Sequence, residues 1–133
     1  MSGRAPSPRE LVLVAAGGAA GSVLRHLVSG ALPTPQGLPL GTLAVNLVGA
    51  FALAVVVTVL PHPSRLLLGT GLMGGFTTYS AFALETEALL GSDPAIGLAY
   101  LAATVLGGFC CAVLGLAAGR WMRRRPGGTA WAP

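Results

Sequence analysis

Residues 71–82 form a polar, glycine-rich run inside an apolar segment, and side chains of these types can handle an ion. The run reads Gly-Leu-Met-Gly-Gly-Phe-Thr-Thr-Tyr-Ser-Ala-Phe. Glycine weakens a helix, and Thr and Ser hydroxyls compete for backbone hydrogen bonds, so we expect the helix to break here. Irregular backbone at membrane depth is tolerated only where it is buried or lines a watery cavity, and broken helices expose groups that hold ions. The run indicates an ion-handling membrane protein.

Two further polar side chains lie within other apolar segments. Asn46 is placed mid-span, where its amide either donates hydrogen bonds to an anion or joins two helices. Arg25 lies inside the first apolar segment, nearer its outer end, where a charge must pair, snorkel or face water. Its two open interpretations are a vestibule charge that attracts anions and an interfacial anchor.

Aromatic, hydroxyl and acidic residues follow the polar run. Tyr79 and Phe82 are three residues apart, so they share one helical face, and their positive ring edges can approach an anion or simply pack. Thr77 and Ser80 either line a polar track or bond to their own helix. Glu85 comes one turn after Phe82 and is a possible pore-adjacent carboxylate, because such groups in membranes suggest proton or cation coupling.

Four apolar segments must position these residues, and each is long enough to cross a hydrocarbon core of about 30 Å. The sequence predicts an all-α integral membrane protein in which the third helix is broken near its middle. Residues 10–122 form one membrane domain, between an N-terminal tail of residues 1–9 and a basic C-terminal tail of residues 123–133. The expected spans are Leu11–Leu32, Leu40–Leu60, Leu66–Leu90 and Ala95–Ala118.

The composition supports a membrane protein and argues against several other classes. The chain has 133 residues, of which 9% are charged, whereas soluble domains carry about a quarter. Cys110 and Cys111 are adjacent and have no zinc or redox spacing. No nucleophile–base arrangement or phosphate-binding loop is present, so we do not expect an enzyme. The basic residues lie mostly at the two ends, so membrane topology explains them better than nucleic-acid binding does.

The arginines are strongly asymmetric with respect to the expected spans. An even number of spans places both termini on one side, and the connections on the other side carry no basic residue. The positive-inside rule therefore predicts a multi-pass protein of the cell membrane with both termini in the cytoplasm. The arginines on that side are Arg4, Arg9, Arg65, Arg120, Arg123, Arg124 and Arg125.

Three motifs resemble, in order and spacing, those of the CrcB/Fluc family of fluoride channels. They occupy residues 17–25 (Gly-Gly-Ala-Ala-Gly-Ser-Val-Leu-Arg), residues 41–49 (Gly-Thr-Leu-Ala-Val-Asn-Leu-Val-Gly) and residues 74–82 (Gly-Gly-Phe-Thr-Thr-Tyr-Ser-Ala-Phe). The similarity covers essentially the whole membrane domain. The third motif is the most specific, because few proteins place such a polar run within a span.

The resemblance implies a passive channel that exports cytoplasmic fluoride and protects the cell from its toxicity. Members are antiparallel dimers with two fluoride pathways along the subunit interface. It further implies a structural sodium ion, not transported, held by the backbone carbonyls of Gly74 and Thr77. The fluoride-pathway and vestibule positions of the family fall on Asn46, Tyr79, Ser80, Phe82, Tyr100, Thr104 and, in the vestibule, Arg25.

This sequence departs from the family pattern at two positions and in its charge bias. Tyr79 stands where the family usually has Phe, and Ala81 replaces a second hydroxyl beside Ser80. Homodimeric members insert in both orientations and need a weak charge bias, whereas this chain is strongly biased. We therefore expect an antiparallel dimer either with itself or, as the charges favour, with an oppositely oriented homologue.

Two other functions remain open from the sequence. A small proton-coupled multidrug exporter also has four spans, but it would need a carboxylate inside the first helix, where this chain has Arg25 and only Glu10 at the start. A non-conducting partner subunit of a heterodimeric channel would explain the glycines and is made plausible by Tyr79, but it would not explain the polar break.

Overall fold

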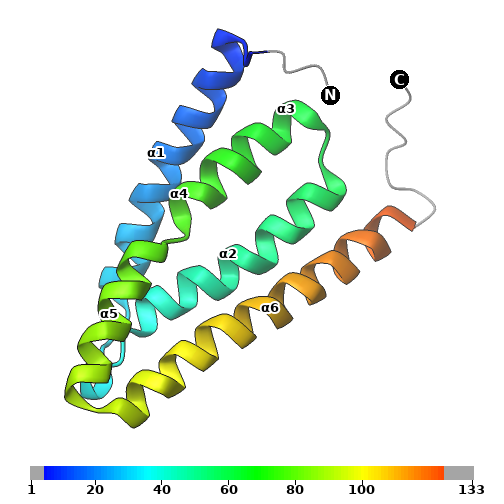
Figure 1. The fold of residues 1–133 in the computed structure, drawn as a ribbon. Helices are drawn as coiled ribbons and strands as arrows, with labels where there is room; N and C mark the ends of the chain where they lie inside the picture. The colour runs from blue at the N-terminus through cyan, green and yellow to red at the C-terminus, as the bar shows by residue number, and fades with distance from the viewer. Residues whose placement is uncertain (1–4, 125–133) are drawn as a thin grey trace.

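The computed structural model describes residues 5–124, apart from the side chain of Gln36, and this part of the chain is helical without strands. Helices α1, α2 and α6 are long and unbroken, and the third crossing is divided into short pieces (Figure 1). A single turn of 3₁₀ helix, η1, connects α1 to α2. The elements in order are α1 (Pro8–Ala31), η1 (Pro35–Gly37), α2 (Leu40–Val59), α3 (His62–Arg65), η2 (Leu66–Met73), α4 (Gly74–Phe76), α5 (Tyr79–Ser92) and α6 (Pro94–Arg124).

The chain runs back and forth four times between two ends of the molecule, which confirms the predicted fold class. The start of α1, the connection from α2 to α3 and the end of α6 lie toward one end (Figure 1). By length and composition, α1, α2 and α6 can each cross a membrane alone. The third crossing combines α3, η2, α4 and α5, because the predicted break interrupts it between Phe76 and Tyr79.

Helix α1 begins earlier, and helix α6 ends later, than the sequence analysis expects. Helix α1 begins at Pro8, because Ser7 and Glu10 form a capping box that satisfies the first backbone donors. Helix α6 continues past Ala118 to Arg124, and its last turn contains Arg123 and Arg124, where basic side chains complement the helix dipole. Part of each expected tail is therefore helix, and residues 1–4 and 125–133 lie outside the described residues.

Glycines bring α1 into direct backbone contact with the third crossing. A Cβ atom added at Gly75 would overlap the carbonyl oxygen of Gly18, and one added at Gly17 would overlap that of Leu67. The same close approach joins α2 to α6, where a Cβ at Gly115 would overlap the carbonyl of Phe51. Small residues permit this close approach of helices, and it holds the broken segment against α1.

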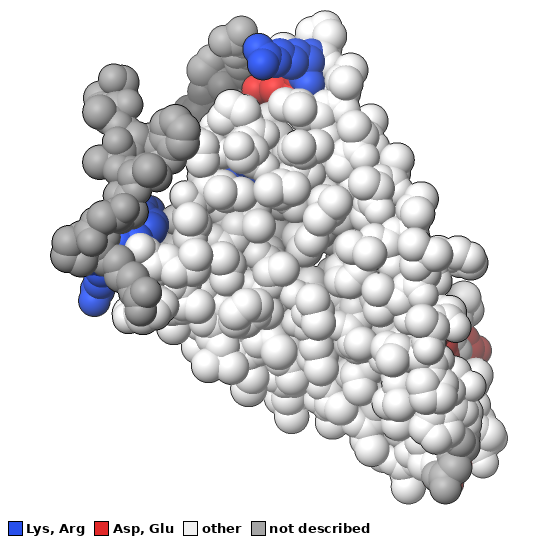
Figure 2. All heavy atoms as spheres, turned by 180° about the vertical axis from the view of Figure 1, so that it is seen from behind, with Lys and Arg blue, Asp and Glu red and all other residues white. Residues whose placement is uncertain are grey.

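The basic side chains lie mostly toward one end of the molecule, on the side where α1 begins. On the face drawn in Figure 2, blue side chains lie toward that end and the long body is almost entirely uncharged. At this end, Arg123 donates from Nη1 to the carbonyl of Thr58, 3.3 Å away, which ties the end of α6 to the end of α2.

Candidate functional site

The third crossing breaks because two residues leave the helical conformation. Helix α4 ends at Phe76, Thr77 has a ψ of 157°, and Thr78 is extended with a φ of −145° and a ψ of 121°. The amide and the hydroxyl of Thr77 both donate to the Met73 carbonyl, each at 3.0 Å, which closes the first half. The Thr78 hydroxyl accepts from the Ala81 amide and caps the second half, helix α5.

Asn46 of α2 satisfies the backbone at the break. Its Oδ1 accepts from the Thr78 amide at 2.9 Å, and its Nδ2 donates to the Thr78 carbonyl at 3.1 Å. An amide nitrogen has two protons, and no second acceptor for Nδ2 is found among residues 5–124. Asn46 thus joins α2 to the break and keeps one donor proton for another partner.

Arg25 contacts one backbone carbonyl on the α4 side of the break, and a second carbonyl there, that of Gly74, loses its helical donor. Nη1 of Arg25 donates to the carbonyl of Thr77 at 3.3 Å, so this half-buried side chain reaches the break instead of only the membrane interface. In a continuous helix the Thr78 amide would bond to the Gly74 carbonyl, but here it donates to Asn46. Gly74 is exposed, with open space where a Cβ would be.

Three aromatic rings follow the break in a connected row. The rings of Tyr79 and Phe82 have centroids 6.2 Å apart, and Phe82 and Tyr100 have centroids 5.7 Å apart, both pairs tilted. Tyr79 is 80% exposed, so apart from its contact with Phe82 this ring lies on the surface of the described chain. Ser80 is also exposed, with its hydroxyl oxygen 3.4 Å from that of Thr78.

The Glu85 carboxyl group is held between two other helices. Oε1 accepts from the Thr42 hydroxyl of α2, and Oε2 accepts from the Tyr100 hydroxyl of α6, both at 2.7 Å. The Thr104 hydroxyl donates to the Tyr100 carbonyl one turn away, at 2.8 Å. Hydrogen bonds therefore connect the aromatic row, through Tyr100, to Glu85 of α5 and Thr42 of α2.

The structure brings together most of the candidate residues and adds one that sequence reasoning missed. Asn46, Arg25 and Thr77 lie together at the break. Farther along the third crossing, the Tyr100 hydroxyl donates a hydrogen bond to the Glu85 carboxyl group. The missed residue is Thr42, which accompanies Glu85. Its signal was available, because Thr42 lies four residues before Asn46 and so shares its helical face.

The fold and the site together define a multi-pass helical membrane protein with a side-chain-braced break in its third crossing. The sequence profile of the family described as "CrcB-like protein, Camphor Resistance (CrcB)" matches residues 12–116. The chain belongs to this family.

Relatives of known name are similar over nearly the full length of both chains. The chain is 42% identical to "Fluoride-specific ion channel FluC 2" of Nocardia farcinica, over 86% of this chain and 87% of the relative. It is 43% identical to "Fluoride-specific ion channel FluC" of Thermotoga maritima, covering 84% and 94%. It is 40% identical to the protein of the same name from Methanopyrus kandleri, covering 83% and 88%. These names describe ion channels and not enzymes.

Proposed function

We propose that this chain is a subunit of a passive, fluoride-specific channel that exports cytoplasmic fluoride and so protects the cell. The observation that carries the proposal is the break at Thr77 and Thr78, braced by Asn46, in a chain at least 40% identical to proteins named as fluoride-specific channels. Fluoride enters cells as neutral HF and dissociates inside. A passive pathway then suffices for net efflux when the outside is acidic.

Fluoride is small and strongly hydrated, so a pathway must replace its water with hydrogen-bond donors. The remaining Nδ2 proton of Asn46, the exposed Ser80 hydroxyl and the ring edges of Tyr79 and Phe82 are the available groups. The hydroxyls of Tyr100 and Thr104 donate within the protein, so they contribute only by exchanging those bonds for fluoride. Arg25 supplies positive charge beside the break.

The proposed cofactor is one structural sodium ion at the centre of the dimer, bound by the carbonyls of Gly74 and Thr77. Backbone carbonyls are oxygen ligands that suit hard cations. The Gly74 carbonyl is released from its helical partner, which fits this role. The Thr77 carbonyl already accepts from Arg25, and its second lone pair is the one left for the ion. When bound, sodium supplies a fixed positive charge close to the anion pathway.

The proposed assembly is an antiparallel dimer in the cell membrane, with both termini of this chain in the cytoplasm. The exposed ring of Tyr79 and the exposed Gly74 backbone need a covering surface at membrane depth, and a second subunit provides it. The arginines gathered at one end favour a single orientation. The proposed partner is therefore an oppositely oriented homologue. A conducting antiparallel dimer formed by this chain alone would contradict the need for such a partner.

Neither alternative explains the site as well. A proton-coupled drug exporter needs an acid within the first helix, and Glu10 instead caps the start of α1 through Ser7. A non-conducting subunit leaves the hydrogen-bond donors along the break without a role. Fluoride flux measured with this chain alone and with its homologue distinguishes a non-conducting subunit from a conducting one.

The proposal is tested by growth of a bacterium that lacks its own fluoride exporter. Expression of this chain, alone and with the homologue encoded beside it if there is one, is expected to restore growth in millimolar fluoride, more clearly in acidic medium. Growth in high chloride is the control. Equal fluoride sensitivity with and without the membrane-inserted protein would contradict the proposal.

A further inference from the structure

The apolar side of α6 that points away from the bundle ends in two arginines. Counted at about 100° per residue, Leu106 and Val113 lie on one side of α6, and both are exposed. Arg120 and Arg124 continue this side at the end of the helix and are exposed as well. Gly115, which packs against the backbone of α2, lies on the opposite side. An apolar surface that faces lipid thus leads directly to a pair of positive charges.

This pair of arginines lies at the depth of lipid headgroups. Residues 95–118 contain no charged side chain, and at about 1.5 Å per residue they span roughly 36 Å. A hydrocarbon core is about 30 Å thick, so α6 has crossed it before the chain reaches Arg120. Trp121, the next residue, is 57% exposed, and tryptophan is enriched at the interface between membrane and water. The end of α6 therefore lies where the phosphate groups of lipids are found.

The charges at this end of α6 have no carboxylate on the same helix. Helix α6 contains no acidic residue, and Asp93 precedes its opposite end, where Oδ1 accepts from the amides of Ala95 and Ile96. Arg120 and Arg124 are four residues apart, so their guanidinium groups are neighbours of the same charge, which is destabilising by itself. An anion between the two guanidinium groups relieves this repulsion.

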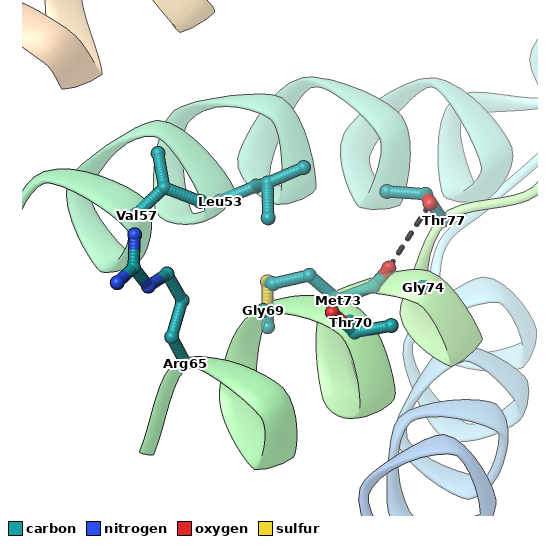
Figure 3. Close-up of a pocket in the computed structure, with 8 residues that line it drawn as sticks. All are labelled: Leu53, Val57, Arg65, Gly69, Thr70, Met73, Gly74 and Thr77. Carbon is teal, nitrogen blue, oxygen red and sulfur yellow. Dashed lines mark hydrogen bonds between the residues drawn. The ribbon is translucent and has the colours of Figure 1, made fainter. Parts of the chain in front are cut away.

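A third arginine is held beside the pair by a contact with α2. Nη1 of Arg123 donates to the carbonyl of Thr58 at 3.3 Å, which uses one of its five N–H donors and fixes the guanidinium group at the end of α2. Arg65, at the same end of the molecule, is instead turned toward α2 near Val57 (Figure 3). Arg65 therefore serves as a control for positive charge at this end.

We propose that the end of α6 binds the headgroup of an anionic phospholipid, with the lipid phosphate between Arg120 and Arg124. The acyl chains then lie along the apolar side that contains Leu106 and Val113. Guanidinium groups bind phosphate oxygens through paired, charge-assisted hydrogen bonds, and clusters of basic residues beside a membrane span recognise anionic lipids. The site concerns the lipid that surrounds the protein and not the ion pathway, so it does not rest on the proposed function.

The test measures quenching of Trp121 fluorescence by lipids with brominated acyl chains. Trp131→Phe leaves Trp121 as the only tryptophan of the full-length chain, which is reconstituted in vesicles of phosphatidylcholine. Brominated phosphatidylglycerol or brominated phosphatidylcholine then replaces a rising fraction of the lipid. We expect half-maximal quenching at a mole fraction on the order of tenfold lower for the brominated phosphatidylglycerol. High salt reduces this preference because it screens the charges.

Two double variants remove the same charge from the same end of the molecule. We expect Arg120→Gln combined with Arg124→Gln to abolish the preference for phosphatidylglycerol. Arg9→Gln combined with Arg65→Gln is the matched control and retains the preference, since Arg9 lies exposed on α1. Lysine at positions 120 and 124 restores most of the preference, because a point charge also attracts phosphate. Equal quenching by brominated phosphatidylcholine in every variant shows that membrane insertion is unchanged.

Three results would overturn the inference. Equal quenching by the two brominated lipids in the protein with all its arginines would show that no anionic lipid is preferred at this site. An equal loss of preference in the two glutamine double variants would show that only the net charge of this end matters. Absence of quenching by either lipid would show that a second subunit covers this side of α6. None of these measurements requires conduction, so the proposed function stands or falls separately.

Discussion

The side-chain amide of Asn46 pairs with both backbone groups of Thr78, accepting from its amide at 2.9 Å and donating to its carbonyl at 3.1 Å. One side chain of α2 thereby pairs both backbone groups of Thr78, whose amide has no partner within the broken helix. Asn46 therefore stabilises the break, and its Nδ2 keeps one proton for which no acceptor is found among residues 5–124, the donor that the proposed function assigns to fluoride.

Replacement of Asn46 tests both of these roles. Asn46→Leu leaves both backbone groups of Thr78 unpaired, and we expect a loss of about 1–3 kcal/mol in stability for each buried group. Asn46→Asp keeps the acceptor and loses the donors, so fluoride flux falls more than stability does. Thermal unfolding in detergent and flux in liposomes measure the two effects. Thr58→Val is the control, because the Thr58 hydroxyl bonds only within α2. Full flux in Asn46→Asp would contradict the anion role.

Tyr79→Phe tests whether the unusual hydroxyl matters. The ring is 80% exposed and touches Phe82, and the substitution keeps this contact. For Tyr79→Phe we expect unchanged stability and a fluoride flux at least as high as in the wild type. Tyr79→Ala removes the ring edge, and we expect it to lower the flux on the order of tenfold. If Tyr79→Phe abolishes the flux, the hydroxyl and not the ring edge is the group that carries fluoride.

Glu85→Ala is expected to destabilise the protein because it leaves two buried hydroxyls without acceptors. Thr42 and Tyr100 are 5% and 1% exposed, and both donate to this carboxyl group. The predicted loss of stability is about 2–4 kcal/mol. Glu87→Ala is the matched control on the same helix, since Glu87 is exposed and its loss has little effect. Equal melting temperatures for the two variants would show that the Glu85 network is unimportant for stability.

Gly75→Ala tests the close packing that holds the break against α1. Its new methyl group overlaps the carbonyl of Gly18, and backbone cannot move aside cheaply, so we expect destabilisation of about 1–3 kcal/mol. Gly108→Ala adds a methyl group to open space on α6 and serves as the control. The prediction fails if the two variants unfold at the same temperature.

Sodium dependence tests the proposed central ion. Replacing sodium by a large organic cation on both sides of the membrane is expected to lower fluoride flux or dimer stability, and returning sodium restores it. Lithium and potassium, which differ in size, are the comparison ions. Flux and dimer stability that are indifferent to the cation would exclude a structural sodium at Gly74 and Thr77.

The four crossings and the break could be predicted because their signals are local. Long apolar runs define the spans, and the run from Gly71 to Phe82 contradicts a continuous helix. The ends of the helices could be predicted less precisely, because the Ser7 capping box starts α1 before the apolar run begins.

Partners across helices could not be predicted from a single sequence. Asn46 and Glu85 are recognisable as polar residues in spans, but their contacts with Thr78, Thr42 and Tyr100 depend on how the helices are rotated and staggered. The π-helical winding of η2 could not be predicted either, because no pattern in Leu66–Met73 distinguishes this winding from an ordinary α-helix.

The most direct measurement of the central claim is fluoride efflux from liposomes that contain the purified protein, alone and with its homologous partner, with chloride efflux measured in parallel. We predict rapid loss of fluoride with retention of chloride in at least one of the two preparations, and a clear reduction with Asn46→Asp. A folded, membrane-inserted protein that releases no fluoride in either preparation, or that releases chloride equally well, would contradict the account.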